Sequence, residues 1–157
     1  MKAMIFDMDG TLADVSSIVH HLNVPLNRME IEALDLYHEL SVDVPAVEET
    51  VRAAQSAHDL GYAVLIVTAR KTRYMEVTGH FIVKHDIPCE AIFMRSDDDL
   101  RSDYELKKDI LRRIRAQGYV VERDYDDNPE IIKLWQEAGV ETVHVTGFGF
   151  DYDILQS

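Results

Sequence analysis

The chain has 157 residues, 46% of them hydrophobic, and one cysteine, Cys89. This composition predicts a single compact domain over residues 1–157, and it excludes a disulfide framework and a multi-cysteine zinc cluster. The formal net charge of −13 argues against a protein that wraps a nucleic-acid backbone, but it allows a small contact with a polynucleotide end. Because the apolar runs are too short for a signal peptide or a membrane span, we expect a soluble cytoplasmic protein with no membrane contact.

Short runs of apolar and β-branched residues alternate with helical patterns along the chain. The predicted strands lie, in chain order, at residues 2–7, 62–68, 90–94, 119–125 and 141–146. The predicted helices cover residues 28–40, 45–60, 71–86, 103–117 and 129–138. Because this alternation is typical of βαβ units, we expect a three-layer, Rossmann-like α/β fold, with helices on both faces of a parallel sheet.

Polar side chains follow three of the predicted strands. They are Asp7 and Asp9 after the first strand, Thr68 and Arg70 after the second, and Asp124, Asp126 and Asp127 at the end of the fourth. In open parallel sheets, ligands bind beyond the carboxyl ends of the strands. These side chains therefore predict a functional site at one edge of the sheet.

The first of these groups lies in "MIFDMDGTL", residues 4–12, where two carboxylates stand two positions apart before Gly10. An Asp-Gly hairpin turn is the alternative, but the following "TLADVSSI" is a poor partner strand. Two unit charges about 4 Å apart repel by about 4 kcal/mol at an effective dielectric constant of about 20, so a cation is expected. Oxygen ligands without histidine or cysteine favour Mg²⁺, and the acidic runs lack the spacing of an EF-hand.

A buried carboxylate can also act as a nucleophile in phosphoryl transfer. Such a reaction needs a hydroxyl for the phosphate oxygens and a cation for the developing charge. Thr68, at the end of "AVLIVT", and Lys107, near the start of "YELKKDILRRI", supply these groups. The sequence therefore favours phosphoryl transfer.

Four motifs, "FDMDGTL", "VLIVTAR", "YELKKDI" and "RDYDDNPE", occur in the order of the motifs of the haloacid dehalogenase (HAD) superfamily, which the chain resembles from residue 4 to about residue 146. The resemblance implies that Asp7 is the nucleophile and Asp9 the general acid and base. It implies that Thr68 holds a phosphoryl oxygen and that Lys107 neutralises Asp7 and the phosphate. The implied Mg²⁺ ligands are Asp7, the backbone carbonyl of Asp9 and one or both of Asp126 and Asp127.

Within the superfamily, the chain is most similar to the 3′-phosphatase domain of bacteriophage polynucleotide kinase/phosphatase. Arg70 lies two positions after the motif hydroxyl, and Asp103 lies four before the motif lysine. The resemblance implies substrate contacts for these two residues, and Lys71 joins them as a cation at a predicted helix N-terminus. Two departures stand out. The sequence has no P-loop of a kinase. An arginine that the phage enzyme carries about a dozen residues after its nucleophile is replaced here by the apolar region around Ile18, and Arg28 is the nearest arginine that could substitute for it.

The implied activity is Mg²⁺-dependent removal of 3′-phosphate from polynucleotide ends in strand repair, through an aspartyl-phosphate. Residues 13–44 leave room only for a minimal cap, which favours an open site and a macromolecular substrate. A phosphatase of a small metabolite or nucleotide and a catalytically idle Mg²⁺-binding module remain the alternatives. Any kinase or ligase partner would be a separate protein.

Several other residues admit a structural role as readily as a functional one. Asp103 either buttresses Lys107 or Arg70 or caps a helix, and Lys71 either binds phosphate or lies on a solvated helix face. We expect Trp135 to pack in the core and His38 to be a surface or partly packed residue. The aromatic segment "GFGFDY" at 147–152 predicts an ordered tail over the sheet edge, without an assigned function.

Overall fold

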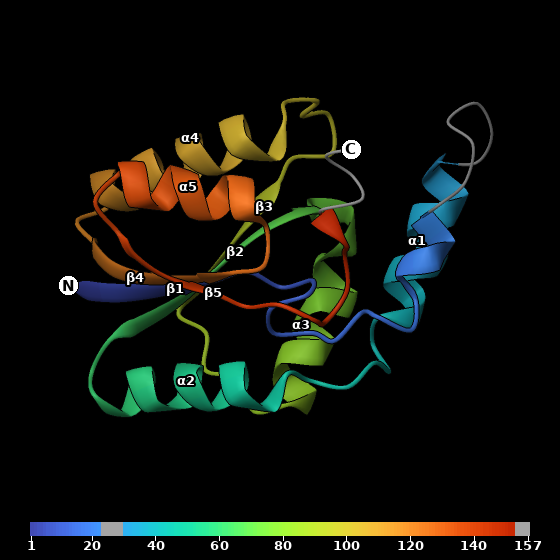
Figure 1. The fold of residues 1–157 in the computed structure, drawn as a ribbon, viewed down its shortest axis with the longest axis horizontal. Coiled ribbons are helices and arrows are strands. Elements are labelled where there is room, and N and C mark those ends of the chain that lie inside the picture. The colour runs from blue at the N-terminus through green and yellow to red at the C-terminus, as the bar shows by residue number, and fades with distance from the viewer. Residues whose placement is uncertain (23–29, 153–157) are drawn as a thin grey trace.

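A computed structural model describes residues 1–22 and 30–152, and these residues form a five-stranded sheet (Figure 1). Its strands are β1 (Lys2–Phe6), β2 (Ala63–Lys71), β3 (Ala91–Arg95), β4 (Val120–Asp126) and β5 (Glu141–His144). The spatial order is β3-β2-β1-β4-β5, and each neighbouring pair is parallel. Because the chain runs outward from β1 in both directions, the crevice for a ligand lies at the carboxyl end of β1.

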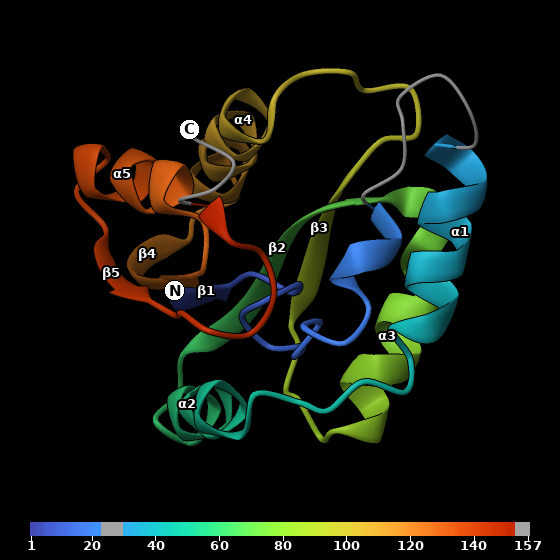
Figure 2. The same cartoon turned by 45° about the vertical axis from the view of Figure 1, so that its right-hand side comes forward.

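Helices cover both faces of the sheet, as Figure 1 shows. They are α1 (Glu30–Leu40), α2 (Glu48–Asp59), α3 (Met75–Lys84), α4 (Asp103–Ala116) and α5 (Pro129–Glu137), with short 3₁₀ turns η1 (Val19–Leu22) and η2 (Thr72–Tyr74). Helices α4 and α5 lie on one face, α2 and α3 lie on the other, and α1 stands beside α3 (Figure 2). The predicted three-layer α/β fold is confirmed.

The two-residue period of β1 divides the core between the two layers. Ala3 and Ile5 pack in a cluster with buried residues of α4 and α5, among them Ile110 and Trp135. Met4 and Phe6 point to the other face, where their cluster includes buried residues of α2 and α3. Trp135 is fully buried, so packing is its role, as the sequence predicted. Burial on both faces fixes β1, and with it the residues that follow it.

The junction after β2 and the cap of α4 differ from the sequence predictions. Strand β2 continues to Lys71, which pairs with Arg95 of β3 after a register shift, and η2 then precedes α3. A helix starting at residue 71 is therefore wrong, because the sheet hydrogen bonds extend the strand. Helix α4 is capped by Ser102, whose hydroxyl accepts the backbone N–H of Glu105 at 3.2 Å. Asp103 is thus the first helical residue rather than the cap.

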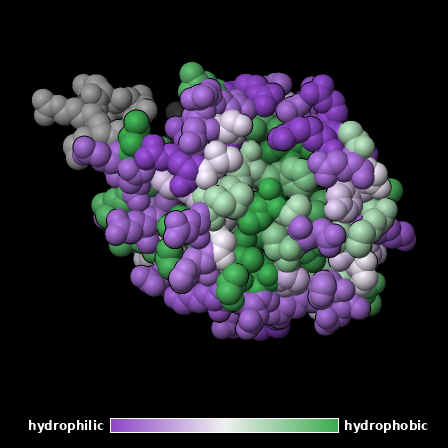
Figure 3. Space-filling view, turned by 180° about the vertical axis from the view of Figure 1, so that it is seen from behind, coloured by the Kyte–Doolittle hydropathy of each residue, from purple (hydrophilic) through white to green (hydrophobic). Residues whose placement is uncertain are grey.

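The face behind the view of Figure 1 presents the free edge of β3. Ala91, Ile92 and Phe93 of this strand are half-buried. In Figure 3, hydrophobic residues gather in a band across the middle of this face, framed by hydrophilic ones. None of the helices in the described part of the chain is long and apolar enough to cross a membrane.

Candidate functional site

The chain turns sharply after β1. The carbonyl of Met8 accepts the backbone N–H groups of Thr11, Leu12 and Ala13 at 3.2, 2.9 and 2.9 Å, and Gly10 N–H donates to the Ala13 carbonyl at 2.9 Å. The sheet neighbours of β1 are β2 and β4, which lie parallel to it. The segment after Asp9 is therefore a compact loop, and the hairpin alternative is wrong.

Gly10 occupies a position where any side chain would be strained. Its φ of +80° lies in the left-handed region, and a Cβ added there would overlap Oδ2 of Asp127. Since real Cβ contacts do not approach so closely, Asp127 would have to move. The glycine therefore allows the loop after β1 to lie against the acidic residues that end β4.

Gly10→Ala is expected to displace Asp127 and to destabilise the fold by about 1–3 kcal/mol, since a left-handed residue other than glycine adds strain to the steric overlap. The matched control is Gly61→Ala, because Gly61 has a φ of +90° but nothing within 4 Å of an added Cβ. Thermal unfolding with and without Mg²⁺ measures both effects. Equal losses in the two variants, with equal stabilisation by Mg²⁺, would show that the contact with Asp127 is unimportant.

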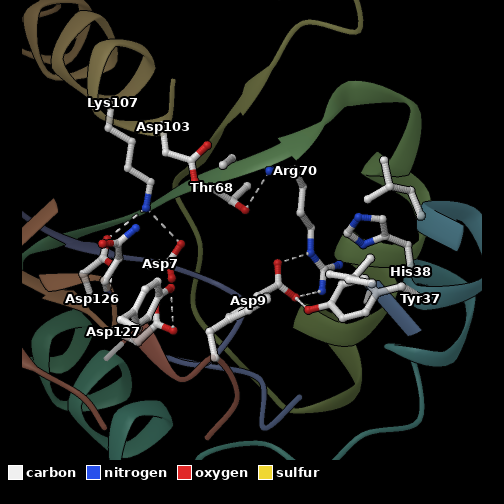
Figure 4. A pocket seen from close by; sticks show the side chains of 16 residues that line it. Asp7, Asp9, Tyr37, His38, Thr68, Arg70, Asp103, Lys107, Asp126 and Asp127 are labelled. Atoms are coloured by element: carbon white, nitrogen blue, oxygen red, sulfur yellow. Dashed lines mark hydrogen bonds and ion pairs between the residues drawn. The ribbon is translucent and has the colours of Figure 1, made fainter. Parts of the chain in front are cut away.

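A lysine and three aspartates form the buried centre of the site (Figure 4). Lys107 of α4 donates from Nζ to Oδ1 of Asp7 at 3.0 Å and to Oδ2 of Asp126 at 2.9 Å. One carboxylate oxygen from each of Asp7, Asp126 and Asp127 lies within 4.8 Å of the others. The fold thus brings together residues that are 100 positions apart along the chain.

These carboxylates carry more negative charge than Lys107 can balance. Burial and the neighbouring Asp126 raise the pKa of Asp7 to about 7, against the opposing effect of Lys107. Burial, with Asp7 and Asp126, raises the pKa of Asp127 to about 10. Burial also raises the pKa of Asp124, beneath them on β4, well above its ordinary value. The centre therefore favours binding either protons or a further cation.

The donor set fits a hard divalent cation. Its ligand atoms are carboxylate oxygens, which Mg²⁺ prefers, and Asp7 and Asp127 share a hydrogen bond that requires a proton between them. A divalent cation can replace that proton. Asp126 has both oxygens engaged, by Lys107 and by the N–H of Asn128 at 3.0 Å, whereas Asp127 accepts the hydroxyl of Tyr152 at 3.2 Å. This buried cluster could therefore hold a metal ion.

Asp9 lies on the other side of the pocket and points toward Arg70 and Tyr37 in Figure 4. Arg70 donates from Nε to Oδ2 of Asp9 at 2.8 Å and from Nη2 to Oδ1 at 2.7 Å. Burial would raise the pKa of Asp9, but the charge and hydrogen bonds of Arg70 outweigh it and lower the pKa to about 2. Asp7 and Asp9 therefore have pKa values shifted in opposite directions, a pattern that separates roles at catalytic sites.

Thr68 and Arg70 come from the carboxyl-terminal part of β2. The hydroxyl oxygen of Thr68 accepts the backbone N–H of Arg70 at 3.2 Å, which leaves the hydroxyl proton for another partner. The third nitrogen of Arg70, Nη1, donates to the Thr78 hydroxyl at 2.9 Å. The predicted substrate contact of Arg70 is thus accompanied by a structural link between Asp9 and α3.

Of the two other predicted substrate-binding residues, one lines the pocket and the other does not. Asp103 lines the pocket, but its carboxylate accepts Arg95 Nη2 at 2.6 Å, and the described contacts give it no bond to Lys107 or Arg70. Lys71 ends β2 and lies outside the residues that line this pocket. Arg28, the nearest substitute for the phage arginine, lies outside the described residues. The role of the Asp9 backbone carbonyl as a metal ligand remains a prediction.

Four aromatic pocket residues were not assigned to the site from the sequence. Tyr37 and His38 come from α1, and Phe150 and Tyr152 come from the C-terminal segment. His38 is buried, not on the surface, and burial lowers its pKa to about 4. The aromatic run "GFGFDY" was the one sequence feature that could have drawn attention to Phe150 and Tyr152. Nothing in the sequence of α1 indicated that Tyr37 and His38 would line the pocket.

Comparisons with known proteins agree with this geometry. The family described as "Polynucleotide kinase PNKP phosphatase domain" matches residues 1–150. A protein of Autographa californica nuclear polyhedrosis virus, described as "Putative bifunctional polynucleotide kinase/RNA ligase", is 26% identical over 145 residues, which make up 90% of this chain and 19% of that protein.

Solved structures show the same fold. A chain in the "Structure of the Pnkp1/Rnl/Hen1 RNA repair complex" has a TM-score of 0.76 and 24% identity, over 96% of this chain and 43% of that one. A HAD hydrolase, family IA, variant 3, from Entamoeba histolytica HM-1:IMSS has a TM-score of 0.71 and 15% identity, over 100% of this chain and 89% of that one. This chain spans less than half the length of the viral and RNA-repair relatives.

The family match covers nearly the whole chain, and the matched residues include the four motifs that the fold brings to one rim. The chain belongs to the polynucleotide kinase PNKP phosphatase domain family and is a phosphatase with the HAD hydrolase fold.

Proposed function

We propose that this phosphatase removes 3′-phosphate groups from polynucleotide ends through an aspartyl-phosphate on Asp7, with Mg²⁺ as cofactor. The observation that carries the proposal is the position of Lys107, whose Nζ bonds both Asp7 and Asp126 in a pocket that Asp9 and Thr68 also line. Nucleophile, neutralising cation, hydroxyl donor and second carboxylate thus face one cavity of about 250 Å³.

In the first step an oxygen of Asp7 forms a bond to phosphorus, and the bond from phosphorus to the leaving oxygen breaks. The leaving oxygen takes a proton from Asp9. Arg70 keeps Asp9 ionised in the free protein. The negative charge of a bound phosphate ester raises the pKa of Asp9, which takes up a proton from water as the substrate binds and then gives it to the leaving oxygen. Lys107 and the Thr68 hydroxyl bind phosphoryl oxygens. The positive charge of Lys107 also offsets the repulsion between the Asp7 carboxylate and the negatively charged phosphate.

In the second step a water molecule attacks the phosphorus atom and gives a proton to Asp9. The bond between phosphorus and Asp7 then breaks, which releases inorganic phosphate and restores the carboxylate. When phosphate leaves, Asp9 releases this proton to water and returns to the ionised state of the free protein. Asp7, Asp126 and Asp127 would hold the divalent cation, which would supply positive charge near the transferring phosphoryl group.

A polynucleotide end is the proposed substrate class. The family match and the viral and RNA-repair relatives support it. The described part of the insertion before α2 lines the pocket through Leu22, Leu34, Tyr37 and His38. A separate kinase or ligase is a proposed partner. The viral relative is described as a bifunctional polynucleotide kinase/RNA ligase, the other relative is a chain of an RNA repair complex, and this chain matches only a part of each.

One observation favours a smaller substrate. Lys107 and Arg70, the cations that line the pocket in the described part of the chain, are both already paired with carboxylates, and the chain has a net charge of −13. A pocket of this kind binds one phosphate well but attracts a long polyanion weakly. A phosphatase of mononucleotides or other small esters is therefore the second candidate.

A substrate panel separates these candidates. A 3′-phosphorylated oligonucleotide, its 5′-phosphorylated twin and a 3′-mononucleotide are compared by phosphate release, with Mg²⁺ and with EDTA. We expect the 3′-phosphorylated oligonucleotide to give the highest kcat/KM and EDTA to abolish its turnover. Preference for the 5′-phosphorylated strand or for the mononucleotide would reject the polynucleotide 3′-end, and full activity in EDTA would reject the metal.

A further inference from the structure

The insertion before α2 delivers one hydroxyl group to the active site. Tyr37, on α1, donates its hydroxyl to Oδ1 of Asp9 at 2.9 Å, although 28 residues separate the two along the chain. We infer that Tyr37 is a positioning residue that fixes the Asp9 carboxylate so that Oδ2 is the oxygen that exchanges protons with the leaving group and with water. This inference rests on the proposed function of Asp9 as general acid and base.

The hydrogen bonds of Asp9 leave one position for a substrate. A carboxylate has about four lone-pair positions, two on each oxygen. On Oδ1, one is occupied by Tyr37 and the other by Nη2 of Arg70, whereas Oδ2 accepts only Nε of Arg70 in the described contacts. The free position therefore belongs to Oδ2, and the Tyr37 hydroxyl is what makes the two oxygens unequal.

The Asp9 carboxylate is more exposed than the two side chains that hold it. The side chain of Asp9 is 17% exposed, compared with 2% for that of Arg70, and Tyr37 is also 2% exposed. Asp9, Tyr37 and Arg70 all line the pocket. Figure 4 shows the Asp9 carboxylate facing Tyr37 and Arg70. A leaving group can therefore approach Asp9, the more exposed group, while Tyr37 and Arg70 hold it in place.

Contacts with the segment after β2 hold Tyr37 in place. Its ring meets that of His38 edge to face at 4.9 Å, and His38 packs on Tyr74 at 4.0 Å. Tyr74 donates its hydroxyl to Asp35 of α1 at 2.7 Å, and Arg73 pairs with the same carboxylate at 3.2 Å. These contacts join α1, which carries Tyr37, to the segment that links Arg70 to α3. The two hydrogen-bond partners of Asp9 are therefore held in place relative to each other.

Arg70 alone would not make the two carboxylate oxygens of Asp9 unequal. Its fork binds both oxygens of Asp9, but without Tyr37 a second lone pair on Oδ1 would be open to water or substrate. The carboxylate would then exchange protons at either oxygen and would turn more freely about the fork. Since proton transfer needs a defined geometry, a smaller fraction of bound substrate would react.

The test is Tyr37→Phe, which keeps the ring and removes the hydroxyl. Protonation by Asp9 matters for a poor leaving group and little for p-nitrophenol, which leaves readily as an anion. We expect kcat/KM for a 3′-phosphorylated oligonucleotide to fall about tenfold or more, the effect of losing a hydrogen bond to a charged group. We expect kcat/KM for p-nitrophenyl phosphate, which reports the first step alone, to change by less than about twofold.

Tyr62→Phe is the matched control. Tyr62 is half-buried and also donates to a carboxylate, that of Glu122, at 2.7 Å, but it lies outside the residues that line the pocket. The control variant should leave both activities unchanged. In the Asp9→Asn background, Tyr37→Phe should cause no further loss with the 3′-phosphate, since it acts through Asp9.

The outcomes separate this inference from the function on which it rests. If the wild type hydrolyses neither ester, the proposed function fails. If the wild type is active and Tyr37→Phe lowers both activities equally, raises either, or leaves both unchanged, the positioning role is rejected. An additional loss in the Asp9→Asn background would also reject it.

Discussion

Asp7→Asn is expected to lower phosphatase activity by at least about 1,000-fold, because an amide oxygen is too weak a nucleophile to attack phosphorus. The fold should persist. The substitution keeps the shape of the side chain, and it removes one negative charge from a buried cluster in which burial and Asp126 already raise the pKa of Asp7 to about 7. Hydrolysis of p-nitrophenyl phosphate with Mg²⁺ measures activity, and chemical unfolding measures stability.

The matched control for this prediction is Asp43→Asn. Asp43 pairs with Lys84 on the surface, and its side chain is 86% exposed, so the change of charge is the same but the site is untouched. Wild-type activity in Asp7→Asn would exclude the aspartyl-phosphate. Absence of activity in the wild type, toward activated esters with Mg²⁺, would instead support a catalytically idle module.

Lys107→Met is expected to destabilise the metal-free protein by about 3–5 kcal/mol, because it leaves two buried carboxylates without their cation. The loss should grow as pH rises. Burial and neighbouring acids raise the folded-state pKa of Asp7 to about 7, so between roughly pH 4 and pH 7 the folded protein binds protons that the unfolded chain releases. Removing Lys107 raises that pKa further, so the fall in stability then continues above about pH 7.

Denaturant unfolding in EDTA at about pH 5 and about pH 8 measures this loss, with Lys108→Met as the control. Lys108 is the next residue of α4 but is exposed, so its replacement should cost less than about 0.5 kcal/mol at either pH. A loss for Lys107→Met that is independent of pH would mean that Asp7 and Asp126 do not depend on this lysine.

The residues on the central strands could be placed from the sequence. "FDMDGTL" and "VLIVTAR" follow or contain runs that are typical of buried strands, and parallel strands end at the same edge, so Asp7, Asp9 and Thr68 were expected together. Lys107 was expected beside them from its place near a helix start and from motif order. These roles remain predictions, but the structure does bring the side chains into one pocket.

Residues on short or exposed segments could not be placed in the same way. Lys71 was expected at a helix start, but pairing with Arg95 extends β2 through it and leaves it outside the pocket. Asp103 was expected to cap a helix or support Lys107 or Arg70, but it pairs with Arg95. In both cases the deciding partner is Arg95 of β3, a separate element whose position local sequence patterns do not report.

By itself the sequence determined the α/β fold, the order of the motifs and the acidic centre, because burial of the central strands β1 and β2 on two faces and the chemistry of phosphoryl transfer both leave a local signature. Only the tertiary structure decided which groups surround Asp9 and Asp127. Tyr37 and Tyr152 reach the site from the insertion and from the C-terminal segment, and each donates a single hydroxyl to a carboxylate. Such a contact depends on where two distant segments pack, so it leaves no periodicity or motif along the chain.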